Sequence, residues 1–131
     1  MERKFGLSQA EYEIMELFWS AEKPLSFKEV LQYFNNEKGR EWKKQTVSSF
    51  LKILQDKNLI EADASQTKYT YRAIYTKDEH VHLWTQRLIE DLFDNSVGKF
   101  LAAFSGGEKL SEMDARELRE YLKAHEEQMQ D

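Results

Sequence analysis

Residues 42–54 read WKKQTVSSFLKIL, and this stretch decides how the rest of the chain is interpreted. At 3.6 residues per turn, four apolar side chains fall at i, i+3, i+4 and i+7 and form one stripe: Val47, Phe50, Leu51 and Leu54. The opposite face carries short or flexible polar side chains: Gln45, Ser48, Ser49 and Lys52. The pattern predicts an amphipathic helix with one side in the core.

Two lysines, Lys43 and Lys44, fall in the first turn of this predicted helix, and no capping side chain precedes them. A cation at this end is unfavourable by about 0.3–1 kcal/mol, because the helix dipole places partial positive charge there. Such a broken local rule often marks a functional site, and bound phosphate would remove the penalty. We therefore predict a helix that enters the DNA major groove with its N-terminus first. The alternative is an amphipathic helix whose polar face is only solvated.

The segments around this helix have the order of a winged-helix domain. Residues 8–20 and 26–34 are predicted helices, because each opens with a capping box. Residues 35–40 are predicted to form a polar loop before the third helix. Residues 59–63 and 69–75 are rich in β-forming residues and predict a hairpin.

The hairpin tip, residues 64–68, would be the wing of this domain. Lys68 is expected to contact a phosphate backbone there, with Arg72 as a second candidate. The alternative is that the two strands only close the core. Together with Lys68, we expect Lys43, Lys44 and Thr46 to hold phosphates, while Gln45, Ser48, Ser49 and Lys52 face base edges.

The second half of the chain predicts a helical region for self-association. A capping box at residues 76–79 opens one long helix to about residue 104, and Gly106-Gly107 separates it from a last helix. Two helices alone would bury their apolar stripes poorly, so we expect pairing with a second chain. Packing onto the first domain is the alternative. The expected dimerisation residues are Trp84, Leu88, Leu92, Val97, Leu101, Phe104, Leu118 and Leu122.

The predicted fold is therefore mainly α with a small β-hairpin. It comprises a winged-helix DNA-binding domain over residues 1–76 and a helical dimerisation domain over residues 77–131.

The net charge of −5 argues against DNA binding only if it is taken as one number. Residues 1–76 hold 12 Lys+Arg and 11 Asp+Glu, a net +1, whereas residues 77–131 hold 7 and 13, a net −6. Residues 38–57 contain six basic and two acidic side chains. Because salt screens charges beyond about 10 Å, the local basic patch matters more than the total. The acidic half still favours an alternative, a winged-helix protein-interaction module without sequence-specific DNA binding.

Several other classes of protein are disfavoured. No cysteine is present, so disulfides, thiolate metal sites and cysteine nucleophiles are excluded. His80 and His82 are two residues apart on a helix and point in nearly opposite directions, which disfavours a shared metal ion. The sequence has neither a nucleophile elbow nor a phosphate-binding glycine loop. We expect no enzyme, no catalytic residues, no cofactor and no metal.

The sequence also lacks a run of about 18 apolar residues and an apolar signal segment, which predicts a cytoplasmic protein without a membrane partner.

The order of these elements resembles the penicillinase-repressor family of winged-helix repressors. The likeness runs from residue 7 to about residue 123 and is carried by LSQAEYEIMELFW (7–19), EWKKQTVSSFLKILQDKNLI (41–60), KYTYRAIY (68–75) and KLSEMDARELREYL (109–122). The resemblance implies a homodimeric transcriptional repressor on an inverted-repeat DNA operator, controlling antibiotic-resistance or related genes. Thr46 matches the family's reading helix, whereas arginines common in that helix are replaced here by Ser48 and Ile53. The operator sequence is therefore expected to differ.

The resemblance also implies a regulatory protease as a partner in the members that respond to β-lactams. These members are cut at an Asn-Phe bond in the tail helix, and the aligned bond here is Ala103-Phe104. The Phe is kept and the Asn is replaced, so the resemblance does not by itself carry this cleavage over. The sequence does not locate a small-molecule effector pocket between the two halves, which remains a further alternative.

Overall fold

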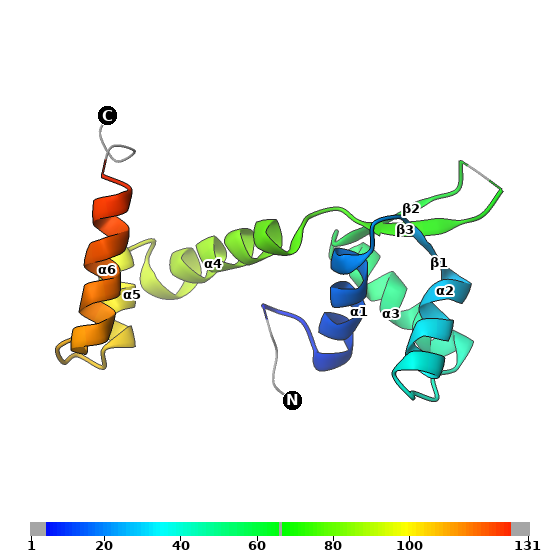
Figure 1. The fold of residues 1–131 in the computed structure, drawn as a ribbon, viewed down its shortest axis with the longest axis horizontal. Helices are drawn as coiled ribbons and strands as arrows, with labels where there is room; N and C mark the ends of the chain where they lie inside the picture. The colour runs from blue at the N-terminus through cyan, green and yellow to red at the C-terminus, as the bar shows by residue number, and fades with distance from the viewer. Residues whose placement is uncertain (1–4, 66, 127–131) are drawn as a thin grey trace. The chain divides into compact units, whose positions relative to one another are not determined.

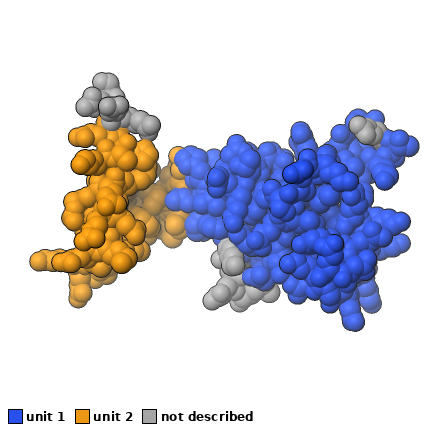
Figure 2. Space-filling model, in the orientation of Figure 1, with its two compact units in different colours: residues 1–85 blue, residues 86–131 orange. Residues whose placement is uncertain are grey.

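The computed structural model describes residues 5–65 and 67–126, which fall into two compact units, Met1–Thr85 and Gln86–Asp131. Figure 2 colours the two units separately. The first unit extends past the domain boundary predicted after residue 76, because the first turns of the next helix pack on it. The assignment of DNA binding and dimerisation to the two parts stays a prediction. None of the helices in the described residues has the length and apolar character needed to cross a bilayer.

All three predicted capping boxes are present in the first unit, including the one between Thr76 and Glu79. Helix α1, Gln9–Ser20, opens at Ser8, whose hydroxyl accepts from the Glu11 N–H while the Glu11 carboxylate accepts from the Ser8 N–H. Helix α2, Phe27–Gln32, opens at Ser26 in the same way. The helix starts were thus predictable because the capping residues lie next to one another in the sequence.

The loop predicted from residue 35 is partly wrong. Helix α2 continues directly into a π-helical turn, η1, over Tyr33–Glu37. The turn persists because Phe34 is fully buried and the Asn35 side chain is satisfied by hydrogen bonds to the main chain of Trp42. A polar run predicts a loop only when its side chains have no such partner.

Helix α3, Lys44–Asp56, follows after an extended segment and contributes one side to the core. Val47, Leu51 and Leu54 are at most 1% exposed, which confirms the predicted apolar stripe. The helix ends before Asn58, which has a φ of +60° and so turns the chain in the left-handed conformation. The core of the unit is built by α1, α2, α3 and the sheet, through Leu7, Tyr12, Ile14, Met15, Phe18, Leu25, Val30, Phe34, Val47, Leu51, Leu54, Leu59 and Ile60.

The sheet has three antiparallel strands in the order β1-β3-β2. The predicted hairpin is formed by β2, Ile60–Asp63, and β3, Thr70–Ala73. Strand β1, Leu25–Ser26, was not predicted, because two residues are too short to show alternation. Figure 1 shows the three helices on one side of the hairpin, whose tip extends past them. This is the arrangement of a winged helix.

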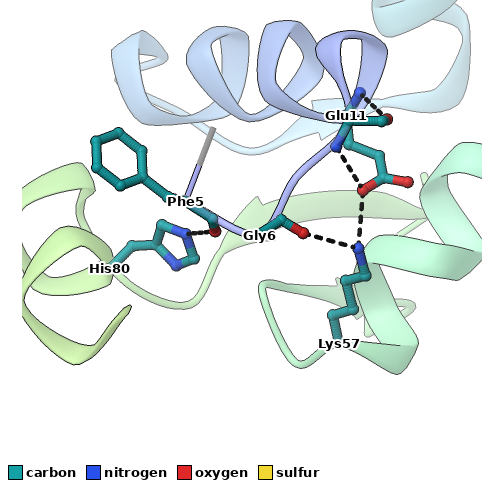
Figure 3. A network of polar contacts seen from close by, with 6 residues as sticks. Phe5, Gly6, Glu11, Lys57 and His80 are labelled. Atoms are coloured by element: carbon teal, nitrogen blue, oxygen red, sulfur yellow. Dashed lines mark hydrogen bonds and ion pairs between the residues drawn. The ribbon is translucent and has the colours of Figure 1, made fainter. Parts of the chain in front are cut away.

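A polar network ties the segment before α1 to the rest of the first unit (Figure 3). The Lys57 ammonium donates to the Glu11 carboxylate at 2.8 Å and to the Gly6 carbonyl at 3.4 Å. On the other side, His80 Nε2 lies 3.2 Å from the Phe5 carbonyl. Gly6 has a φ of +79°, and a Cβ there would lie 3.3 Å from the Trp84 indole nitrogen, so only glycine fits easily.

Three helices cover residues 77–124, and the single long helix predicted to residue 104 is wrong. Helix α4, Lys77–Phe93, and helix α5, Val97–Phe104, are separated by Asp94 and Asn95, with φ of +50° and +58°. Ser96 then caps α5 by accepting from the Lys99 N–H at 3.0 Å. The prediction of one helix followed the regular spacing of apolar residues on both sides of the break. It overlooked that Asp, Asn and Ser are residues that favour turns and caps. The last helix, α6, covers Glu112–Ala124.

Candidate nucleic-acid interface

The outer face of α3 carries the predicted DNA-binding side chains, and the fold of the N-terminal unit leaves this face open. Thr46 is half-buried at the edge of the face, beside the buried stripe. The exposed members are Lys43, Lys44, Gln45, Ser48, Ser49 and Lys52. Together these polar side chains line a surface that could enter the major groove.

The first turn of α3 has neither a capping side chain nor an acidic residue to balance the positive end of the helix dipole, as the sequence predicts. Lys43 is the N-cap residue and makes no side-chain capping hydrogen bond, and the first turn contains no acidic residue. The first regular bond of the helix runs from the Val47 N–H to the Lys43 carbonyl at 3.2 Å. The N–H groups before Val47 have no helical partner, so they and the two lysines form a site suited to phosphate.

Fewer basic side chains in residues 38–57 are free to bind phosphate than the sequence implies. Arg40 donates through Nη2 to both carboxylate oxygens of Glu13, at 2.6 and 2.8 Å, and Lys57 is paired with Glu11. Within the described residues, the α3 lysines make no ion pair. The charge available for phosphate is therefore concentrated on α3 itself.

Among the described residues, the wing holds one cation without an ion pair and one cation that is paired with a carboxylate. Lys68 is exposed after the tip, and residue 66 of the tip lies outside the described residues. Arg72 is ion-paired with Glu61, its register partner on β2, so this residue is a weaker phosphate candidate than predicted. Hydrogen bonds from the Ser65 hydroxyl and from the Ser65 N–H, the latter at 2.8 Å, lower the pKa of the Asp63 carboxyl. The wing is thus of mixed charge, with Lys68 as its free cation among the described residues.

The sequence analysis missed the residues that hold the segment before α3. The Asn35 amide bonds the main chain of Trp42, and the Arg40–Glu13 pair ties the same segment to α1. The signal was an asparagine in a polar run, which composition alone assigns to a loop. Ile53 is also 37% exposed on α3, an apolar residue suited to contact with a thymine methyl group.

A model of the penicillinase-repressor family matches residues 7–124. The chain belongs to the penicillinase-repressor family. Members of this family are DNA-binding transcriptional repressors rather than enzymes, which agrees with a winged helix whose third helix is open. Comparison with curated proteins gives no match. Among solved structures, the crystal structure of a mutant of MepR from a multidrug-resistant S. aureus clinical isolate is 18% identical, covering 96% of this chain and 81% of that chain with a TM-score of 0.45.

The predicted dimerisation residues fall into three groups. Trp84 lies in the first unit, where its ring meets Phe5 edge-on with centroids 5.4 Å apart, so it already has a partner within its own chain. Three side chains in the second half are half-buried: Leu88, Leu101 and Leu118. Four others are 46–68% exposed: Leu92, Val97, Phe104 and Leu122.

The candidate cleavage site is the peptide bond between Ala103 and Phe104. Both residues are exposed, and they are the last two residues of α5. Of the two histidines considered as a metal pair, His80 is buried against the Phe5 carbonyl and His82 is exposed. The environment of His80 is that of a packed side chain, with Trp19 at a ring distance of 5.6 Å.

Proposed function

We propose that the chain is a homodimeric, sequence-specific repressor that inserts α3 into the major groove of an inverted-repeat operator. The proposal is carried by one observation: α3 buries Val47, Leu51 and Leu54 of its apolar stripe and exposes its lysine-bearing polar face. Lys43, Lys44, Thr46 and Lys68 contact phosphates. Base edges are read by Gln45, Ser48, Ser49 and Lys52.

Homodimerisation is supported by the surface of the second unit. None of its described residues, 86–126, is fully buried. Large apolar side chains are 46–71% exposed in this stretch, namely Leu92, Val97, Phe104, Met113, Tyr121 and Leu122. An apolar pocket of about 310 Å³ also opens between α5 and α6, lined by residues such as Phe100 and Leu118. Apolar surface on this scale marks an interface, and two-fold pairing would place two α3 helices on two half-sites.

The test compares Lys43→Ala with Gln45→Ala on two duplexes. One duplex is selected by the wild-type protein from a library with a randomised centre, and the other is its scrambled counterpart. Lys43→Ala should weaken binding to both and reduce the slope of log affinity against log salt by about 1, because one phosphate contact is lost. Gln45→Ala should instead reduce discrimination at one base pair by about 1–3 kcal/mol. Unchanged salt slope and unchanged discrimination together would remove α3 from the interface.

The protein-interaction alternative is supported by the net charge of −5. Salt-dependent retention of the chain on a nonspecific duplex separates the two proposals, since a module that binds only protein should not be retained.

Release of repression by a protease is proposed for the Ala103-Phe104 bond. Its position at the end of α5 means that the helix must open locally before the bond can enter an active site. Both residues are exposed, so this opening would not require the core to unfold. We also propose that the regulated genes serve antibiotic resistance and that the repressor acts in the cytoplasm.

A further inference from the structure

The start of α3 is fixed from outside the helix rather than by its own sequence. Lys43, at the N-cap, offers no side-chain hydrogen bond to the first turn. A helix end without a capping side chain is less stable than a capped one and tends to fray. The proposed DNA contacts nevertheless begin at this end, so their geometry depends on whatever holds the preceding residue.

Asn35, on the π turn η1, holds the main chain of Trp42 with both atoms of its amide group. Asn35 Nδ2 donates to the Trp42 carbonyl at 2.9 Å, and the Trp42 N–H donates to Asn35 Oδ1 at 2.9 Å. A side chain that bonds both polar groups of one residue fixes the orientation of that residue as well as its position, as a neighbouring strand would. Trp42 directly precedes Lys43, so this pair of bonds sets where α3 begins.

The Trp42 indole is packed as firmly as its main chain. Its ring centroid lies 4.7 Å from that of Phe34, which is fully buried, and 5.4 Å from that of Phe50 on α3. The Arg40 guanidinium also lies near this ring, 5.9 Å from its centroid. The indole therefore links the core, the segment before α3 and the helix itself.

We propose that Asn35 is a positioning residue for DNA recognition. Its two hydrogen bonds hold Trp42, and through Trp42 they hold Lys43, Lys44 and Gln45 in place against the DNA. The inference rests on the proposed DNA-binding role of α3. Asn35 is half-buried and acts through the main chain, so its removal should affect recognition without removing a phosphate contact.

The first test is Asn35→Ala, with Asn36→Ala as a matched control. Asn36 lies beside Asn35 on the same π turn, is exposed, and makes no side-chain hydrogen bond within the described residues. Using the selected and scrambled duplexes described above, Asn35→Ala should bind the selected duplex about tenfold more weakly, the loss expected when one base-edge contact is misplaced. Its affinity for the scrambled duplex should stay within about twofold, because the lysines remain. Asn36→Ala should behave as the wild type on both.

The second test is a double-mutant cycle with Gln45→Ala. If Asn35 positions Gln45, the effect of Gln45→Ala on discrimination should largely disappear in the Asn35→Ala background. A residue that only stabilises the fold would give additive effects at a temperature where every variant is folded, as checked by circular dichroism. Should Asn35→Ala fail to fold, Asn35→Ser takes its place, since its side chain is polar but too short to reach both main-chain groups.

Wild-type discrimination by Asn35→Ala, or additive effects in the cycle, would overturn the positioning role. A Lys43→Ala/Lys44→Ala double variant separates this outcome from failure of the proposed function. If the double variant loses affinity for both duplexes while Asn35→Ala binds normally, only the positioning role is wrong. If the double variant binds as the wild type does, α3 is not the reading helix, and the role of Asn35 is overturned with it.

Discussion

At the scale of single residues, Glu11 connects three parts of the N-terminal unit. Its carboxylate completes the capping box of α1 and accepts the Lys57 ammonium, which also reaches the Gly6 carbonyl (Figure 3). Burial on its own would raise the pKa of Glu11, but the bonds from Lys57 and Ser8 outweigh it and hold the pKa below the ordinary value of 4.5. The folded state therefore favours the charged form.

The lowered pKa of Glu11 predicts how stability depends on pH. A group whose pKa is lowered on folding contributes stability above its unfolded value and loses that contribution as the pH falls through its folded value. Glu11→Gln should lower the free energy of unfolding by about 1 kcal/mol at pH 7, because the ion pair is lost while the cap can still form. The difference from the wild type should shrink as the pH falls below 4.5.

Urea unfolding followed by tryptophan fluorescence measures this effect, because all three tryptophans, at positions 19, 42 and 84, belong to the first unit. The matched control is Glu22→Gln, an exposed carboxylate without an ion pair in the described residues. A destabilisation by Glu11→Gln that is the same at pH 7 and at pH 4 would show that the charge of Glu11 is not the cause.

At the scale of elements, the sequence predicts those parts whose signals are adjacent in the chain. Spacing within a few residues predicts where α1 and α2 begin, at Ser8 and Ser26. It also predicts the open face of α3. The two-residue strand β1 is defined instead by pairing Leu25 with Tyr71, a partner that no local pattern identifies. The π turn likewise depends on the hydrogen bonds between Asn35 and Trp42. Both elements depend on a partner outside the few residues that a local pattern covers, which explains why they were missed.

The break between α4 and α5 gives a prediction at the same scale. Asp94 and Asn95 adopt left-handed conformations, which cost roughly 1 kcal/mol each for residues with a side chain. Replacing Asp94, Asn95 and Ser96 by alanine should favour one continuous helix and raise the helical circular dichroism signal. The proposed dimer should nevertheless weaken by at least about tenfold, or 1.4 kcal/mol, because the apolar side chains of α5 are turned relative to those of α4.

Sedimentation equilibrium measures the dimer dissociation constant of this triple variant. Substituting Glu90 and Asp91 by alanine is the control, since these exposed residues lie within α4 before the break. A triple variant that is more helical and dimerises as tightly as the wild type would show that the break has no role in assembly.

At the scale of the whole molecule, charge and apolar surface are separated along the chain. The lysines proposed to contact DNA are on α3 and the wing, whereas residues 77–131 carry a net −6 and the most exposed of the large apolar side chains. An acidic second half cannot itself attract DNA, so its contribution to repression would come from pairing two chains. Each α3 then binds as part of a bivalent ligand, and overall affinity exceeds that of one half-site.

Phe104→Glu tests this division of roles, because Phe104 is 60% exposed and its replacement removes no core contact of the N-terminal unit. A carboxylate in a proposed apolar interface should leave the variant monomeric at micromolar concentration, as measured by sedimentation. Its affinity for a selected full-length duplex should fall by about 10²-fold or more, while its affinity for a single half-site stays as in the wild type. Ile74→Glu, at an apolar residue 40% exposed in the first unit, should leave the oligomeric state unchanged. A wild-type chain that is itself monomeric at micromolar concentration would contradict the dimer, and equal loss on full and half sites would place Phe104 in the DNA interface instead.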